Sequence, residues 1–279
     1  MKRIIALLMA VLMVVGVLAA CGNKQADTKA TDSTTASNET TQAKTAADVD
    51  AVKAKGKLIV GITDFEPMDY QDANGNWIGF DADMAKAFAE SLGVKAEFVE
   101  IDWDNKILEL NGGTVDCIWN GMTLTDEVTS AMDCSNPYCN NAQVVIVKKD
   151  DAEKYAKAED CKELNFAVES GSAGQKQAEA YKFKFTEVKD QATALMEVAS
   201  GTCNAAIIDS LMAAAMVGEG TGYAQLTYTA SLNSEEYGVG FRKGSDLKAK
   251  CDEFFAAAKA DGTMEKIAET YKVQAALIK

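Results

Sequence analysis

Polar residues, or small residues that leave the backbone accessible, follow four predicted strands of this chain. In chain order they are Asp64 with Phe65, Asn120 to Thr123, Glu169 to Gly174, and Asp209. Ligands of open α/β sheets lie beyond the carboxyl ends of parallel strands. These four places are therefore predicted to line a ligand site.

Carboxylates and backbone N–H groups are the chemistry that these places offer. Asp209 follows an apolar strand and precedes a predicted helix, so it can bind a cation, cap the helix, or do both. The loop Gly171 to Gly174 opens another helix, whose free N–H groups suit an anion, although such a loop is also an ordinary tight turn. Phe65 and Trp103 lie beside turns, where they can stack on a ligand or pack in the core.

The turn that contains Asn120, Gly121 and Thr123 gathers backbone donors without a neighbouring cation. An acidic helical start, Thr125-Asp126-Glu127, comes next, and the position where a cation would complete an anion site is Val128. The turn alone therefore leaves open what it binds.

Two units of strand, helix and strand must position these residues. Strands are expected at 57–62, 96–101 and 115–119 in the first unit, and at 164–168, 183–188 and 204–208 in the second. The first unit has a helix with a buried stripe of Phe80, Met84, Phe88 and Leu92, opened by Asp81 and stopped by Gly93, and a helix from Asp104 with Ile107 and Leu108 facing inward. This spacing predicts parallel strand pairing in two similarly built α/β lobes.

Two strand-like segments, 142–148 and 237–242, lie where the chain would cross between the lobes. We expect lobe 1 to comprise residues 51–142 and 236–279, and lobe 2 residues 143–235. Two lobes joined by two hinge strands place the ligand site in the cleft between them.

The N-terminus has the order of a secretory signal. Lys2 and Arg3 precede an apolar run, and small residues precede Cys21, so residues 1–20 are predicted to be a signal peptide. Leu18-Ala19-Ala20-Cys21 resembles the bacterial lipobox, which implies lipid on Cys21 and a chain anchored outside the cell membrane; a cleaved, unlipidated peptide is the alternative. Residues 21–50 are polar and small, typical of a flexible tether.

Charge and composition exclude several functions. Removing residues 1–20 takes away Lys2 and Arg3 and no acid, so the formal charge falls from −14 to −16, which disfavours nucleic acid as a partner. Histidine is absent, which excludes histidine-dependent triads and histidine-ligated metals. Six cysteines follow Cys21 without a C-x-x-C pair; buried thiols are favoured, and a bridge such as Cys161 to Cys203 would need an oxidising location.

A series of ordered motifs resembles the polar amino-acid family of ABC-transporter substrate-binding proteins. They are GITDFEPMDY, GNWIGFDADMAKAFAESLGV, IDWDNKILEL, GTVDCIWNGMTLTDEV, SNPY, VESGSAG, AAIID, YGVGFRKGSD and ADGTMEKIAETY, between about residues 55 and 272. The resemblance implies the type II periplasmic-binding-protein fold in a monomeric, non-enzymatic receptor without cofactor or metal. It also implies capture of a small polar solute for a membrane permease.

The family's ligand contacts can be carried over where the motifs match. The resemblance implies that Phe65 and Trp103 sandwich the ligand, and that Asn120, Gly121 and Thr123 hydrogen-bond it. It further implies that the backbone at Ser172 and Ala173 helps to hold a carboxylate, and that Asp209 pairs with an α-ammonium. An acid there is physically apt, because a desolvated ammonium needs a paired acid.

Val128 departs from the family, which usually places a carboxylate-binding arginine at this position. Two interpretations follow: an amino acid held by N–H groups around Thr123 and the loop Ser172 to Gly174, or an amine or organic cation drawn by Asp64, Glu169 and Asp209. The fold also resembles secreted cyclohexadienyl dehydratases, but an acid-rich cleft without that arginine disfavours a dicarboxylate substrate.

Overall fold

The computed structural model describes residues 48–279. The predicted signal peptide, Cys21 and most of the predicted tether lie outside these residues. Helix α1 (Asp48–Lys55) begins inside the tether assigned to residues 21–50, so residues 48–50 are helical instead. Among the described residues, no helix is long and apolar enough to cross a membrane.

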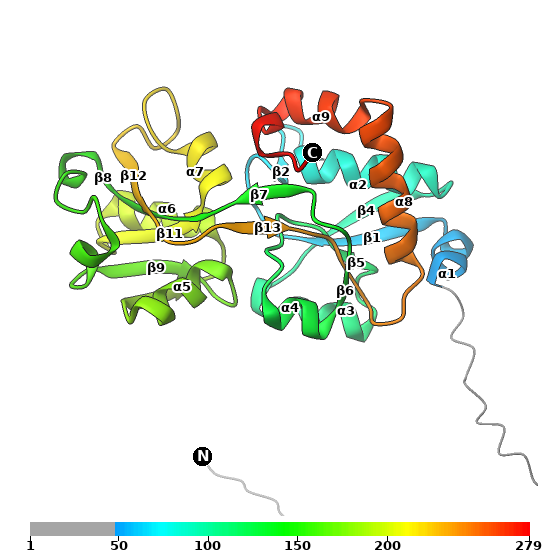
Figure 1. Cartoon of the computed structure of the whole chain (residues 1–279), viewed down its shortest axis with the longest axis horizontal. Coiled ribbons are helices and arrows are strands. Elements are labelled where there is room, and N and C mark those ends of the chain that lie inside the picture. Colours follow the sequence, from blue (N-terminus) through cyan, green and yellow to red (C-terminus); the bar gives the residue numbers. More distant parts are fainter. Residues whose placement is uncertain (1–47) are drawn as a thin grey trace, which may run out of the picture. The chain divides into compact units, whose positions relative to one another are not determined.

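A five-stranded sheet forms the core of lobe 1, in the order β4-β1-β5-β14-β6 (Figure 1). Its strands are β1 (Lys57–Ile62), β4 (Lys95–Glu100), β5 (Cys117–Ile118), β6 (Asp133–Cys134) and β14 (Gly240–Phe241). As predicted, β1 is parallel to β4 and to β5. β14 returns late in the sequence and is antiparallel to β5 and β6.

Lobe 2 is built on a second five-stranded sheet, in the order β10-β9-β11-β8-β12. Its strands are β8 (Gln143–Lys148), β9 (Asn165–Glu169), β10 (Lys184–Val188), β11 (Ala205–Asp209) and β12 (Leu226–Ser231). β9 is parallel to β10 and β11, which confirms the second predicted unit. β8 is antiparallel to β11 and β12.

Two short strands link the lobes, and they are not the segments predicted to cross. β7 (Cys139–Asn141) and β13 (Glu235–Tyr237) pair antiparallel and run side by side between the sheets (Figure 1). The predicted segments, 142–148 and 237–242, mainly belong to the sheets as β8 and β14. Their apolar runs mark sheet strands because a buried strand needs apolar neighbours on both faces. The lobe boundaries at 142–143 and 235–236 stay predictions.

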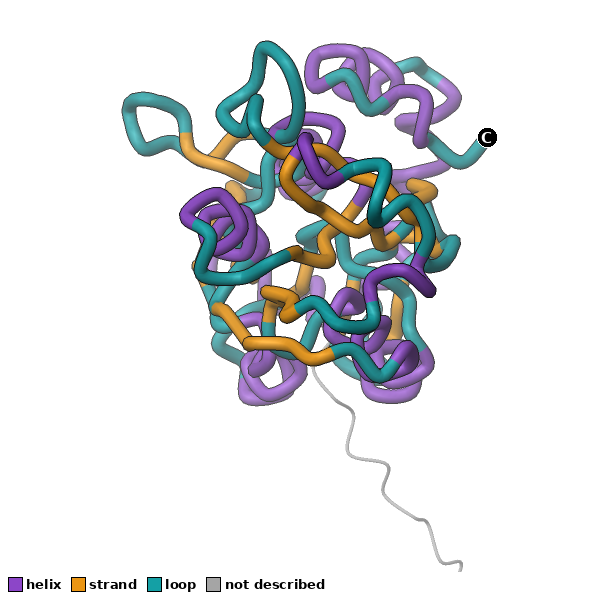
Figure 2. The backbone as a smooth tube through the Cα atoms, turned by 90° about the vertical axis from the view of Figure 1, so that its left-hand side faces the viewer, coloured by secondary structure: helices purple, strands orange, loops and turns teal. Residues whose placement is uncertain are grey.

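Helices surround the strands of both lobes (Figure 2). The remaining α-helices are α2 (Phe80–Ser91), α3 (Lys106–Gly112), α4 (Asp126–Ala131), α5 (Ala173–Tyr181), α6 (Gln191–Ser200), α7 (Ser210–Met216), α8 (Leu247–Ala260) and α9 (Thr263–Tyr271). Shorter elements are the hairpin β2 (Tyr70–Gln71) with β3 (Trp77–Ile78) and four 3-10 turns, at Trp103–Asn105, Lys149–Asp151, Ala158–Cys161 and Gln274–Ala276.

Helix α2 buries the predicted stripe, in which Phe80, Met84 and Phe88 are fully buried. Each such side chain contributes about 1.5–3 kcal/mol through its removal from water. Asp81 does not cap this helix: Gly79 occupies the cap, and the Asp81 carboxylate accepts hydrogen bonds from the N–H of Gly121 (2.6 Å) and the Tyr138 hydroxyl (2.7 Å).

The inward face of α3 differs from the prediction. Leu108 is 69% exposed, whereas Lys106 and Leu110 are buried. Positions four apart share a helix face, so the burial of Leu110 brings Lys106 inward with it. The prediction that Leu108 faces inward was therefore wrong, whereas Ile107, predicted to face inward with it, is half-buried against the lobe 1 core.

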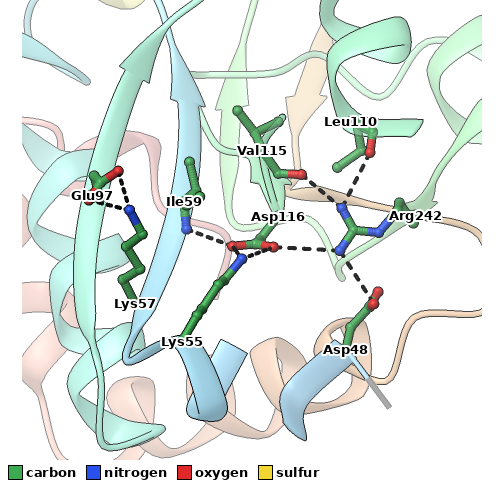
Figure 3. A network of polar contacts seen from close by, with 9 residues as sticks. All are labelled: Asp48, Lys55, Lys57, Ile59, Glu97, Leu110, Val115, Asp116 and Arg242. Carbon is green, nitrogen blue, oxygen red and sulfur yellow. Dashed lines mark hydrogen bonds and ion pairs between the residues drawn. The ribbon is translucent and has the colours of Figure 1, made fainter. Parts of the chain in front are cut away.

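A polar network on lobe 1 accounts for Arg242, which does not reach the pocket (Figure 3). Its guanidinium donates to the carbonyl oxygens of Leu110 (3.3 Å) and Val115 (2.8 Å). It also lies 3.3 Å from a carboxylate oxygen of Asp48 and 3.6 Å from one of Asp116. The network ties helix α1 to the sheet, so Arg242 has a structural role.

All six cysteines between residues 48 and 279 are free, and five of them are buried. They are Cys117, Cys134, Cys139, Cys161, Cys203 and Cys251. This agrees with the expectation of buried thiols, and the suggested Cys161–Cys203 bridge is not formed.

Candidate functional site

A pocket lies between the lobes and is lined by residues of both. About 430 Å³ of space lies between its lining atoms when the open solvent at the mouth is counted. Its lining consists of Phe65, Trp103, Lys106, Asn120, Gly121, Met122, Thr123, Thr125, Glu127, Val128, Glu169, Gly171, Ser172, Ala173, Lys176, Gln191 and Asp209. The residues that follow β5, β9 and β11 thus meet in one place, as the position of the strand ends predicts.

Asp64 is the predicted site residue that the structure places elsewhere. It is exposed and does not line the pocket, whereas Phe65 does. Consecutive residues of an extended chain face opposite ways, so turning Phe65 inward turns Asp64 out. Partial desolvation and the charges of Asp190 and Glu100 raise the pKa of Asp64.

The turn at Asn120 is held by bonds within lobe 1. The Asn120 side chain accepts from the N–H of Thr63 (2.8 Å) and donates to its hydroxyl (2.9 Å). Gly121 adopts φ +54°, and a Cβ there would lie 2.4 Å from the Phe65 ring, so only glycine lets the ring lie against the turn. The N–H of Gly121 is committed to Asp81, and the Thr123 hydroxyl donates to Glu235 (2.8 Å).

The aromatic residues contribute differently to the pocket wall. Phe65 is 2% exposed and packs edge-on against Tyr237, with ring centroids 6.4 Å apart. Trp103 is buried and carries the Lys106 ammonium 4.9 Å from its ring centroid, a cation–π contact. Both residues line the pocket and also pack in the core, so core packing is observed and stacking on a ligand stays a prediction.

Asp209 starts α7 without capping it through its side chain. Its carboxylate instead accepts hydrogen bonds from four buried or nearly buried side chains, those of Asn141, Gln143, Gln191 and Tyr237. Burial raises its pKa to about 7, and the Glu235 charge adds to the rise while the donors oppose it. The cap role left open for the Asp209 side chain is therefore not observed, and its role as a ligand group stays a prediction.

Glu169 is the less satisfied of the two buried acids. Its Oε1 has no hydrogen-bond partner among the described residues, and its Oε2 has only a 3.5 Å contact from the Gln191 amide. Burial first and the Asp209 charge second raise its pKa to about 8. Gln191 hydrogen-bonds both acids. No sequence pattern indicated this role beyond its position after Asp190, which caps α6.

Two lysines line the pocket, and sequence reasoning missed both. Lys106 is 5% exposed and donates to the carbonyl oxygens of Trp103 (3.1 Å) and, across the lobes, of Gly171 (2.8 Å). Lys176 is exposed and pairs with Glu127 of lobe 1 at 2.5 Å. The cleft predicted to be acid-rich and without a cation therefore holds a buried ammonium.

The loop of lobe 2 opens α5 as predicted. The Ser172 hydroxyl accepts from the N–H of Gln175 (3.1 Å) and caps the helix. Its own N–H bonds the Glu169 carbonyl (3.2 Å), and that of Gly171 bonds the Gln175 side chain (2.6 Å). Ala173 is the first helical residue, and its N–H has no partner within the helix, so it remains as a donor at the pocket wall.

Comparison with known proteins identifies the class. Residues 58–274 match the profile of the bacterial extracellular solute-binding proteins, family 3. The chain therefore belongs to this family.

A probable histidine-binding protein of Neisseria gonorrhoeae is 28% identical over 240 residues, which are 82% of this chain and 88% of that protein. A histidine-bound substrate-binding protein of an ABC uptake transporter from Streptococcus pneumoniae is 27% identical, with a TM-score of 0.77 over 84% of this chain and 99% of the other. An ancestral amino-acid-binding protein described as a precursor of cyclohexadienyl dehydratase is 34% identical, with a TM-score of 0.74 over 81% and 99%. These likenesses confirm the type II periplasmic-binding-protein fold, with two α/β lobes joined by two strands.

Proposed function

We propose that this chain captures an amino acid between its lobes and passes it to the permease of an ABC importer. The family and the amino-acid binders among its relatives support this solute class. The observation that carries the proposal is one pocket that collects aromatic faces, buried carboxylates and helix-end donors from both lobes. Such a site favours a small polar solute over a macromolecule.

The location follows from the N-terminal sequence and from the family. We propose an extracytoplasmic monomer, anchored to the cell membrane by lipid on Cys21 and held away from it by the segment after that residue. The family's description as extracellular supports the compartment. We retain residues 51–142 with 236–279 and residues 143–235 as the proposed lobes that close on the solute.

Asp209 is proposed to attract the ligand's ammonium. Asp209→Asn removes the charge with little change in shape, and we expect amino-acid affinity to fall about 100-fold or more, because a buried charge partner is lost. Calorimetric titration with the twenty amino acids measures this. Asp190→Asn is the matched control: it is equally buried in the same lobe but caps α6 through Thr193 and does not line the pocket. Equal affinities for the wild type and Asp209→Asn would contradict the assignment.

Dehydration of prephenate is the competing activity, raised by the ancestral relative. Prephenate has two carboxylates and no ammonium, whereas Glu127, Glu169 and Asp209 all line the pocket. With only two lysines among the lining residues, a dianion without an ammonium leaves these acids without a positively charged partner, which disfavours that substrate. Formation of phenylpyruvate by the purified protein would overturn the binding-protein assignment.

A further inference from the structure

The buried ammonium of Lys106 makes two hydrogen bonds within the protein. Its two hydrogen bonds go to neutral carbonyl oxygens, and no carboxylate of residues 48–279 lies within ion-pair distance of its Nζ. An ammonium has three N–H donors, so one remains. The charges of Glu127, Glu169 and Asp104 act on it without an ion pair at contact, and a buried charge without a contacting counter-ion is costly, so this pocket wall suits an anion.

Glu169 is the complementary group in the same pocket. It is 3% exposed, and one of its oxygens has no partner among the described residues. Asp209 accepts four side-chain hydrogen bonds, three at Oδ1 and one at Oδ2, so only Oδ2 has room for another donor. A ligand ammonium therefore finds free acceptor capacity on Glu169 while it gains from the Asp209 charge nearby.

We propose that Lys106 binds the ligand's carboxylate and Glu169 its ammonium, so that the pocket selects amino acids as zwitterions. The inference rests on the proposed function and deepens it, because it decides between an amino acid and a simple amine. It also makes Lys106 the cation that takes the place of the arginine that is missing at Val128. That side chain lies in an apolar cluster with Trp103, whose ring carries the Lys106 ammonium.

If Lys106 only held the two lobes together, a different result would be expected. Its bond to the Gly171 carbonyl joins the lobes, so losing it would weaken every ligand by the same factor. A carboxylate anchor instead acts only on ligands that carry a carboxylate. Comparing each acid with its own amide therefore separates the two roles.

The experiment titrates the protein with the twenty L-amino acids and with their α-carboxamides. The wild type should bind at least one acid about 30-fold or more tightly than its amide, as expected for a charge-assisted contact. Lys106→Met should remove most of this preference, and Lys106→Arg should restore much of it. Lys176→Met is the matched control, since Lys176 lines the same pocket but is exposed and paired with Glu127; it should affect acid and amide alike.

Three results would overturn the proposal. If the wild type bound an amide as tightly as its acid, the carboxylate would not be recognised, and this test needs no variant. Equal losses for acid and amide in Lys106→Met would leave only the mechanical role. Binding of neither acids nor amides would instead remove the proposed function itself.

Discussion

At the residue scale, the pocket places three charged groups in three different settings. Asp209 accepts four side-chain hydrogen bonds, Glu169 has an oxygen without a partner among the described residues, and Lys106 rests on a tryptophan ring. The pocket brings together most of the predicted residues, but their contacts depend on partners from distant parts of the chain. Asp209 shows this most clearly, because two of its donors, Gln143 and Tyr237, are separated from it by 66 and 28 positions.

Glu169 should make affinity depend on pH. Its pKa is raised to about 8 in the free protein, so it holds a proton at neutral pH, whereas an ammonium prefers the carboxylate. Binding then releases a proton, and affinity for amino acids should rise as pH increases from about 6 to 8. Titrations in buffers of different ionisation enthalpy measure the released proton, and Glu169→Gln should reduce the release.

Glu127→Gln provides the comparison for that experiment. Glu127 also lines the pocket, but its hydrogen bond with Lys176 lowers its pKa, so it stays charged throughout this range. The variant should retain the proton release of the wild type. Release of no proton by the wild type would contradict the role given to Glu169.

At the element scale, the strand ends are the features that the sequence predicts best. Asp81 and Asp209 do not cap their helices through their side chains, but Glu169 and Asp209 end their strands at the pocket and the loop before Ala173 opens α5, as predicted. Such signals need only a few neighbouring residues. Leu108 was assigned to the wrong face of α3 because Leu110 packs in a lobe 1 cluster with Trp103, and neighbours in sequence do not specify that contact.

The loop at Gly171 controls how closely the lobes approach. Gly171 has φ +72°, and a Cβ there would lie 2.7 Å from the Asp104 Cα of the opposite lobe. Gly171→Ala should therefore hold the lobes apart and lower ligand affinity about tenfold or more, beyond a strain of about 1–2 kcal/mol. Small-angle scattering with and without amino acid would report incomplete closure.

Gly56→Ala is the matched control for this prediction. Gly56 has almost the same φ, +70°, but a Cβ there would meet nothing within 4 Å. The variant should share the backbone strain, measured by thermal unfolding, and leave affinity unchanged. Equal loss of affinity in both variants would show that strain, not contact between the lobes, is responsible.

At the scale of the whole molecule, buried acids outside the pocket also matter. Asp69 is fully buried without a partner for either oxygen among the described residues, and Asp81 beside it bonds the Gly121 turn and Tyr138. Burial and the Asp81 charge raise the pKa of Asp69 well above its usual value, and burial raises that of Asp81 to about 7. The acids that hold the binding turn thus make stability depend on pH.

Asp81→Asn should change that dependence. A folded-state pKa above the unfolded value means that the native state binds more protons, so the stabilisation is complete below about pH 4 and is lost as pH rises through about 7. The wild type should lose on the order of a few kcal/mol over this interval from this group. In Asp81→Asn, which keeps an acceptor for Gly121, the free energy of unfolding should vary less; urea unfolding at several pH values measures it.

Asp72→Asn should act at the other end of the pH range. Hydrogen bonds from Asn76 lower the pKa of this exposed acid, so its contribution is lost only as pH falls through that lowered value. For Asp81, the contradicting result would be a free energy of unfolding that changes equally between pH 4 and 7 in the wild type and in Asp81→Asn.

The sequence by itself determined the α/β units, the parallel pairs β1–β4 and β9–β10, and most residues of the pocket. Each depends on a short repeat or on a polar residue at a strand end, which neighbours in sequence decide. Only the tertiary structure decided that Lys106 faces inward, that Asp64 faces outward and that Asp81 supports the turn instead of capping a helix. Burial of a charge depends on contacts across the fold, such as the 65 positions that separate Lys106 from Gly171, and no local pattern encodes them.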